Sequence, residues 1–378
     1  MNRSIDQAEL DRRLIRRGDY VSCRQAFIDC RTPGSDLKEN YSIVGPGVTQ
    51  SDEQVVNLRE AHGFNTGAAA MPGGVVNSLH LHFTAEVFLN WAGRWRVFWG
   101  TGGADGSFEI DPGDIVSVPT WIFRSFTNVG PDYGWIFTVL GFDNTGGIIW
   151  DPSVLTEAER HGLFLTVDNT LVDTVAGQQK PETDALIPAM ATHEIASLRT
   201  WAVEEMQDRV VRQADLRWSR RPFLCSELPG GGAELATVIG YGMTEDRDQV
   251  PPIHYPHNFN VAWLRAAAGE GMLQHRHHEA QVLTGYRGRW EVLLNDGPGQ
   301  LSVELEPYDT LSIPAGVWRT FVALDDDAQL LVTNSGDSRV RLEWPDESQR
   351  HALDKGYSPD AAGYVAPWNV VRYSTLDD

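Results

Sequence analysis

His80 and His82, followed by Glu86, are three residues of the kind that bind divalent transition metals in proteins. In a β-strand, residues two apart face the same side, so both imidazoles should point together. Glu86 is an even number of residues from both histidines, so its side chain should face the same side if the strand continues. Two imidazoles and one carboxylate match the ligand set of non-haem Fe(II) oxygenases. An isolated pair of histidines on a strand is more often structural, so this interpretation needs further support.

A repeat within the chain gives that support. His275, His277 and Gln281 follow 195 residues after the first set. The same offset relates many other residues: Cys30 and Cys225, Gly45 and Gly240, Gly47 and Gly242, Thr49 and Thr244, His62 and His257, Trp95 and Trp290, Pro119 and Pro314, and Arg124 and Arg319. So long an ungapped register predicts two copies of one unit, which we expect to form domains at residues 1–180 and 181–378.

The elements that position these residues are expected to be short strands. Apolar segments are brief and separated by Gly- and Pro-containing turns, which predicts an all-β fold. The histidines should lie on strands over residues 80–89 and 275–283. Helices are expected over residues 4–17 and 194–212, and shorter ones after Trp150 and Trp344.

The motif spacing resembles that of the cupin superfamily. The first cupin motif is matched by Gly74, His80, His82, Glu86 and Gly93, and the second by Gly113, Pro119, Arg124 and Asn128. The second copy retains most of both motifs. The resemblance implies a bicupin with two tandem jelly-roll barrels (double-stranded β-helices) and short flanking helices. It does not fix the reaction, because cupins include dioxygenases, decarboxylases, isomerases, lyases and non-enzymatic binding proteins.

The departures from the cupin pattern concern the metal ligands. Arg124 and Arg319 stand where the pattern has a third metal-binding histidine, and a guanidinium cannot bind a metal. Each arginine could instead bind an anionic substrate through its planar fork. Alternatively, Arg124 forms an ion pair with Glu86 that replaces the metal. Because Gln281 is neutral, a metal at the second set should be weakly held or absent.

Other residues could complete the pockets. His62 and His257 could supply a third imidazole or a proton-transfer group, and a structural role is equally consistent with their positions. Trp121 could form part of a pocket wall. A pocket that combines tryptophan with one arginine would suit a flat, apolar substrate that carries a carboxylate.

Two functional hypotheses follow. In the first, the chain is a dioxygenase-type oxidoreductase with Fe(II) at His80, His82 and Glu86, and with Mn, Ni or Zn as alternative metals. It would act on a small acidic, aromatic substrate, with Arg124 and His62 as catalytic residues. In the second, the chain is a metal-free isomerase, epimerase or lyase with His80 or His62 as general base and Arg124 as electrostatic stabiliser. A small-molecule binding bicupin is a weaker third reading.

Composition limits the partners. The formal net charge of −21 argues against nucleic acid and anionic membranes, since both require a basic surface. No apolar run is long enough to span a bilayer, and the first residues do not resemble a signal peptide. The three cysteines show no metal-binding or disulfide spacing. We therefore expect a cytoplasmic protein with a small-molecule substrate, and leave a homodimer open.

Overall fold

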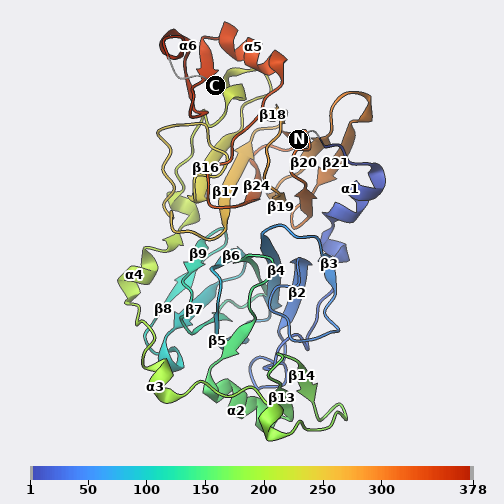
Figure 1. Ribbon diagram of the computed structural model, residues 1–378, viewed down its shortest axis with the longest axis vertical. Helices are drawn as coiled ribbons and strands as arrows, with labels where there is room; N and C mark the ends of the chain where they lie inside the picture. The colour runs from blue at the N-terminus through green and yellow to red at the C-terminus, as the bar shows by residue number, and fades with distance from the viewer. Residues whose placement is uncertain (1–2, 375–378) are drawn as a thin grey trace. The chain divides into compact units, whose positions relative to one another are not determined.

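The computed structural model describes residues 3–374, and the chain forms two compact units (Figure 1). One unit comprises Tyr20–Asp215, and the other comprises Met1–Asp19 together with Leu216–Asp378. Strands dominate both units, as the sequence predicts. Among the described residues, none of the helices is long and apolar enough to cross a membrane.

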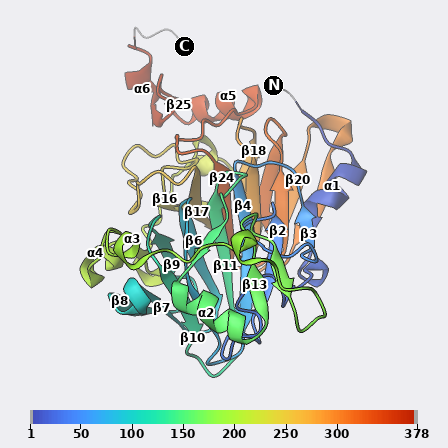
Figure 2. The same cartoon turned by 60° about the horizontal axis from the view of Figure 1, so that its bottom comes forward.

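The unit Tyr20–Asp215 contains two large sheets and a small hairpin. Its elements are β2 (Glu39–Val44), β3 (Val56–Leu58), β4 (Phe64–Met71), β5 (Val76–His82), β6 (Glu86–Ala92), β7 (Trp95–Trp99), β8 (Gly106–Ile110), β9 (Ile115–Val118), β10 (Arg124–Asn128), β11 (Gly134–Gly141), β12 (Ile148–Trp150), α2 (Pro152–Arg160), β13 (Leu163–Leu165), β14 (Leu171–Asp173), α3 (Thr192–Ile195), α4 (Val203–Gln207) and β15 (Val210–Val211). One sheet has the order β15-β9-β6-β11-β4-β2-β3 and the other β12-β5-β10-β7-β8. Figure 2 labels β9, β6, β11, β4, β2 and β3 of the first sheet. Buried side chains from both sheets, such as Phe88 and Phe126, share one core.

The other unit repeats this plan. Its elements are α1 (Gln7–Arg13), β1 (Leu14–Ile15), β16 (Glu234–Ile239), β17 (Phe259–Ala266), β18 (Gly271–His275), β19 (Gln281–Arg287), β20 (Trp290–Leu294), β21 (Leu301–Leu305), β22 (Thr310–Ile313), β23 (Arg319–Ala323), β24 (Ala328–Ser335), α5 (Asp346–Asp354), β25 (Tyr357–Pro359), β26 (Val365–Pro367) and α6 (Trp368–Val371). Its sheets have the orders β1-β22-β19-β24-β17-β16 and β18-β23-β20-β21. The helices expected after Trp150 and Trp344 are α2 and α5.

The N-terminal arm differs from the expected helix over residues 4–17. Helix α1 is shorter, is capped by the Asp6 side chain rather than by Ser4, and gives way to β1, which pairs with β22. Ile5 and Leu10 are buried in the core of the second copy. The arm therefore belongs to the compact unit of residues 216–378, which differs from the expected division into 1–180 and 181–378.

A matching arm precedes the second copy. The helix expected over residues 194–212 is replaced by α3, α4 and β15, and β15 pairs with β9 of the first copy. Arg209 donates to the Ser117 hydroxyl at 2.7 Å, as Arg13 donates to the Ser312 hydroxyl at 3.1 Å. Each copy thus contributes its leading arm to the other copy's barrel. Helix α1 ends at Arg13 because Leu14, the next residue, is extended and pairs with β22.

The strand expected over residues 80–89 is interrupted. Strand β5 ends at His82 and β6 begins at Glu86, and the two strands belong to different sheets. The continuous strand was a wrong prediction, because three residues are used to cross between the sheets. Glu86 therefore approaches the histidines from the second sheet rather than along their own strand. The strand expected over residues 275–283 is also interrupted, because β18 ends at His275 and β19 begins at Gln281 in another sheet.

Gly93 shows why the cupin-like spacing requires a glycine. It lies in the turn between β6 and β7 with a φ of 87°, a conformation that other residues rarely adopt. A Cβ atom at this position would lie 2.8 Å from the Cα atom of Gly134. The turn thus depends on the absence of a side chain, and it allows β7 to pair with β10 in the sheet that carries the histidines.

Candidate metal centre

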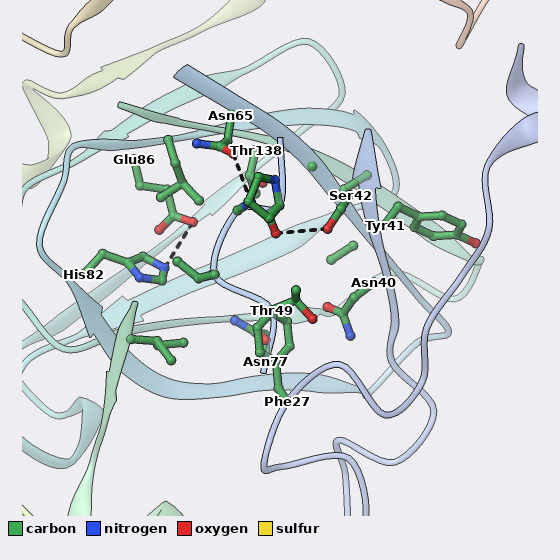
Figure 3. Close-up of a pocket in the computed structure, with 18 of the residues that line it drawn as sticks. Phe27, Asn40, Tyr41, Ser42, Thr49, Asn65, Asn77, His82, Glu86 and Thr138 are labelled. Atoms are coloured by element: carbon green, nitrogen blue, oxygen red, sulfur yellow. Dashed lines mark hydrogen bonds and ion pairs between the residues drawn. The ribbon is translucent and has the colours of Figure 1, made fainter. Parts of the chain in front are cut away.

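His80, His82 and Glu86 converge in the first copy. One potential ligand atom from each lies within 4.8 Å of the others, and all three residues are buried. Nε2 of His82 is 3.6 Å from Oε1 of Glu86 (Figure 3). Two side chains come from β5 and the third from β6, so the site bridges the two sheets of the barrel.

Both imidazoles are held in the tautomer that suits a metal. His80 Nδ1 donates to the Ser78 carbonyl at 2.7 Å, and His82 Nδ1 faces the Gly147 carbonyl at 3.3 Å. A carbonyl only accepts hydrogen bonds, so each Nδ1 carries the proton and each Nε2 presents its lone pair. Burial and the Arg124 charge lower the pKa of both histidines, which keeps the rings neutral.

Arg124 forms an ion pair with Glu86, which is one of the two roles considered for it from the sequence; the other was to bind an anionic substrate. Its Nε and Nη2 atoms donate to Oε2 of Glu86 at 3.1 and 2.8 Å. Nη1 lies 3.4 Å from the carbonyls of His80 and Ile122. Arg124 is fully buried and is not among the residues that line the cavity. It is therefore placed to hold Glu86 and not to bind a substrate directly.

The donor set is compatible with a divalent metal despite this ion pair. Burial opposes ionisation of Glu86, but the charge of Arg124 lowers its pKa, so it remains a carboxylate. Arg124 contacts only Oε2, and Oε1 remains on the side of His82. Two imidazole nitrogens and one carboxylate oxygen can then bind one ion.

A cavity with about 640 Å³ of empty space, part of it open to solvent, adjoins the three residues. Its other polar lining residues are Asn40, Tyr41, Ser42, Thr49, Gln54, Asn65, Thr66, Asn77 and Thr138. Phe126, Leu140 and Trp150 are among the apolar ones. No lysine or arginine lines it within the described part of the chain. The cavity therefore offers neutral hydrogen-bonding groups beside the candidate metal ligands.

The remaining predicted site residues lie elsewhere. Trp121 is 47% exposed and is not part of the cavity lining. His62 is buried outside the lining, where its Nδ1 lies 2.7 Å from the Glu60 carbonyl and its backbone NH binds Asp143. His257 makes the equivalent contacts with Tyr255 and Asp337. These equivalent contacts suggest that the two histidines hold matching loops.

The second set of residues is arranged differently. Arg319 donates to Nε2 of His277 at 3.0 Å and to Oε1 of Gln281 at 3.1 Å. The lone pair that a metal would need on His277 is therefore occupied. Its Nδ1 instead faces Glu279, at 3.3 Å. His275, His277 and Gln281 do not fit a metal in this arrangement, because Arg319 takes the place of the ion.

Comparison with solved structures identifies the architecture. A scan against protein-family models gives no match, and neither does a comparison with curated proteins. Vicilin from Capsicum annuum aligns with a TM-score of 0.54 at 11% identity, over 91% of this chain and 94% of that chain. Oxalate decarboxylase from Bacillus subtilis, which has Mn(II) centres, aligns with a TM-score of 0.53 at 11% identity, over 93% and 85%. The fold is that of a bicupin.

Oxalate decarboxylase from Lactobacillus farciminis, in a formate complex, aligns with this bicupin with a TM-score of 0.50 at 13% identity, over 84% of this chain and 86% of that chain. At such identities the similarity establishes the fold alone. Storage globulins and decarboxylases share the architecture, so the function has to be inferred from the site itself.

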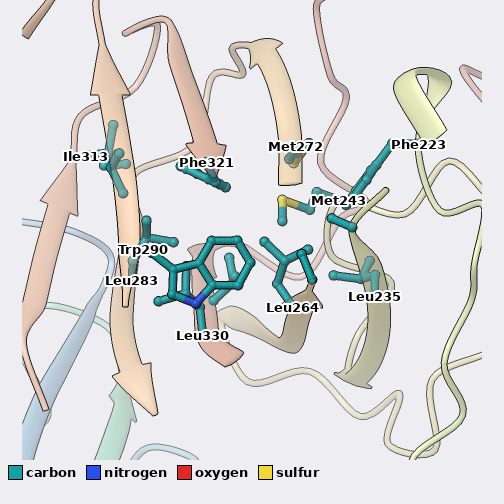
Figure 4. Packing of buried hydrophobic residues seen from close by; sticks show 14 of the residues in the cluster. Phe223, Leu235, Met243, Leu264, Met272, Leu283, Trp290, Ile313, Phe321 and Leu330 are labelled. Carbon is teal, nitrogen blue, oxygen red and sulfur yellow. The ribbon is translucent and has the colours of Figure 1, made fainter. Parts of the chain in front are cut away.

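The two barrels of the bicupin differ in what fills them. Five cavity-lining positions of the first barrel are occupied in the second by larger or less polar side chains: Asn40 by Leu235, Val48 by Met243, Ala69 by Leu264, Asn77 by Met272, and Thr138 by Val332. All five replacements belong to the apolar core of that unit, and four are shown in Figure 4. In the second barrel, the equivalent of the cavity is thus filled by apolar side chains.

Most of the cavity lining was not predicted from the sequence. Asn40, Asn77 and Trp150 were not singled out, although all three line it. The sequence does distinguish Asn40 and Asn77, because the repeat aligns each asparagine with an apolar residue of the second copy. Polar residues at core positions in one copy only indicate a cavity that the other copy lacks.

Proposed function

We propose that this bicupin is a metal-dependent oxidoreductase of the dioxygenase type, with its active site in the cavity of the first barrel. His80, His82 and Glu86 would hold the metal. The observation that carries the proposal is the convergence of two imidazoles and one carboxylate on a polar cavity. Fe(II) is preferred because this ligand set is that of non-haem oxygenases, in which the metal activates dioxygen.

The surrounding residues support a preorganised site. Arg124 fixes the carboxylate of Glu86 through two hydrogen bonds to one oxygen. The carbonyls of Ser78 and Gly147 orient the two imidazoles. Hydrogen bonds that orient the metal-binding side chains commonly set the affinity of a metal site. The Mn(II) centres of the Bacillus subtilis oxalate decarboxylase make Mn(II) the first alternative, ahead of Ni(II) and Zn(II).

The substrate class follows from the lining. No cationic side chain of residues 3–374 lines the cavity to bind the carboxylate of the acidic, aromatic substrate expected from the sequence, because Arg124 is already paired with Glu86 outside the cavity surface. Asparagine, serine and threonine side chains instead suit a small neutral compound with hydroxyl or carbonyl groups. We therefore propose a neutral polar substrate. A homodimer stays a prediction.

One observation favours a second candidate, a metal-free isomerase or lyase. The Arg124–Glu86 pair already balances the charge of the site, so a metal is not needed to compensate the buried carboxylate. His80 is neutral and adjoins the cavity, as a general base requires. In this case Arg124 and Glu86 would be structural.

Oxygen uptake separates the two candidates. The chelator-treated protein would be reloaded anaerobically with Fe(II) and then given small hydroxycarbonyl compounds in air-saturated buffer. The proposal predicts substrate-dependent oxygen consumption that disappears in His80→Ala and persists in His275→Ala. Conversion of a substrate by the chelated protein, without oxygen uptake and without any effect of added metal, would reject the oxygenase in favour of the metal-free enzyme.

A further inference from the structure

A buried ion pair lies directly behind the cavity wall. Lys38 donates to both carboxylate oxygens of Asp29, at 2.8 and 2.7 Å, and to Oδ1 of Asn77 at 2.6 Å. Lys38 and Asp29 are almost fully buried, and neither lines the cavity. An ammonium group has three N–H donors, so this arrangement uses all of them. Asn77 is the member of the network that reaches the cavity.

The ammonium determines which way the Asn77 amide points. Lys38 can only donate, so the atom that faces it must be the amide oxygen. The amide nitrogen, Nδ2, is then the group available on the other side, 3.5 Å from Nδ1 of His80. That ring nitrogen is protonated and donates to the Ser78 carbonyl, so it has no lone pair to accept a hydrogen bond from Asn77. Asn77 therefore keeps N–H donors for a further partner beside His80.

Two other lining residues also have unused hydrogen-bonding capacity. Oε1 of Gln54 and Oγ1 of Thr66 are buried and have no hydrogen-bond partner among the described residues. Both residues line the cavity. A buried polar atom without a partner costs free energy unless a bound group satisfies it. These atoms indicate a ligand that carries hydroxyl groups as well as an oxygen acceptor.

The second barrel shows that the network is not required by the fold. The positions of Asp29, Lys38 and Asn77 are occupied there by Leu224, Ala233 and Met272. All three replacements are buried in the apolar core. The ion pair and the asparagine are thus present in the barrel with the cavity and absent together from the filled barrel.

We infer that Lys38 and Asp29 position Asn77 as a hydrogen-bond donor to a carbonyl oxygen of the substrate. The cavity would thereby select small neutral hydroxycarbonyl compounds over polyols without a carbonyl and over carboxylates. Asn77 is the specificity-determining residue, and Lys38 and Asp29 are positioning residues. This inference deepens the proposed function, because it concerns the same cavity, but it does not require a bound metal.

The test uses chelator-treated full-length protein and 1,3-dihydroxyacetone as probe, with glycerol and glycolate as comparison compounds. Binding would be followed by ligand-observed NMR. Asn77→Asp retains the oxygen toward Lys38 and removes the N–H donors, so it should weaken dihydroxyacetone binding about tenfold or more. Met272→Leu, at the equivalent position of the second barrel, should leave binding unchanged.

A second variant tests the positioning residues. Asp29→Leu combined with Lys38→Ala copies the second barrel and releases the amide to rotate, so the preference for dihydroxyacetone over glycerol should be lost. If this double variant does not fold by circular dichroism, Asn77→Asp decides the question. Unchanged affinity in Asn77→Asp, or tighter binding of glycolate than of dihydroxyacetone, would overturn the inference. Absence of saturable dihydroxyacetone binding by the unmodified protein would overturn it too.

The metal content of the same preparations before chelation tests the proposed function separately. Asn77-dependent probe binding in a protein that takes up no metal would refute the oxygenase and leave this inference intact. Bound metal together with probe binding that does not depend on Asn77 would refute this inference and leave the oxygenase proposal intact.

Discussion

Arg124 donates through Nε and Nη2 to a single oxygen of Glu86, at 3.1 and 2.8 Å. Its counterpart in the second barrel, Arg319, faces Gln281 instead, and within residues 3–374 no carboxylate forms an ion pair with it. Burial lowers the pKa of Arg319 to about 9. One substitution, glutamate to glutamine, thus separates a charge-balanced site from one that holds a buried, unpaired cation.

Gln281→Glu should stabilise the second barrel. The new carboxylate would pair with Arg319 as Glu86 pairs with Arg124, with a gain of roughly 1–2 kcal/mol in the free energy of unfolding. Loss of the bond from Gln281 to Asn334 offsets part of the gain. Urea denaturation at pH 7 measures the change. A loss of stability would show that Arg319 is already satisfied by its neutral partners.

Arg124→Lys should lower stability. Lysine keeps the charge but cannot donate to Glu86 and to two backbone carbonyls with the same geometry, so we expect a loss of about 1–3 kcal/mol. Arg94→Lys is the matched control, since Arg94 forms an exposed pair with Glu109 and should change stability by less than about 0.5 kcal/mol. Thermal denaturation of both variants gives the comparison. An Arg124→Lys variant of unchanged stability would argue against a structural ion pair.

Glu245 should make the stability of its unit depend on pH. Burial raises its pKa from 4.5 to about 7, although its carboxylate accepts hydrogen bonds from Trp344 and Leu224. Because the folded-state pKa lies above the unfolded value, folding favours the protonated form. Its contribution is fully present below pH 4.5, is lost as the pH rises to about 7, and stays lost above that.

Glu245→Gln removes this titration, and the first copy has glutamine at the equivalent position, Gln50. The variant should be more stable than the unmodified protein at pH 8, by about 2–3 kcal/mol, and little changed at pH 4. Unfolding curves at the two pH values measure the difference. The same stability difference at pH 4 and pH 8 would refute a raised pKa for Glu245.

The bicupin architecture could be predicted from the sequence because the repeat and the motif glycines can be recognised from the order of the residues alone. Gly93 and its counterpart Gly288 both have positive φ angles at the expected turns. The exchange of arms could not be predicted, since residues 1–19 adjoin the first barrel in the sequence and pack with the second. The helix-like pattern of the N-terminal segment does not indicate which barrel the segment packs against.

The candidate site was only partly predictable. Spacing brought together His80, His82 and Glu86, although Glu86 arrives from another sheet through a break that periodicity does not mark. Whether Arg124 faces Glu86 or the cavity depends on its rotamer and burial, and composition fixes neither. The Asn77 side chain is oriented by Lys38, which is distant in the sequence. Such a contact can be suspected from the sequence only by comparing the two copies, because the second copy has apolar residues at both positions.

Measuring the metal content tests most directly whether His80, His82 and Glu86 bind an ion. The protein would be purified without chelators and analysed by inductively coupled plasma mass spectrometry, together with His80→Ala, Glu86→Gln and the matched variant His275→Ala. We expect about one divalent ion per chain in the unmodified protein and in His275→Ala, and almost none in His80→Ala and Glu86→Gln. Metal retained in Glu86→Gln, or lost in His275→Ala, would contradict this expectation.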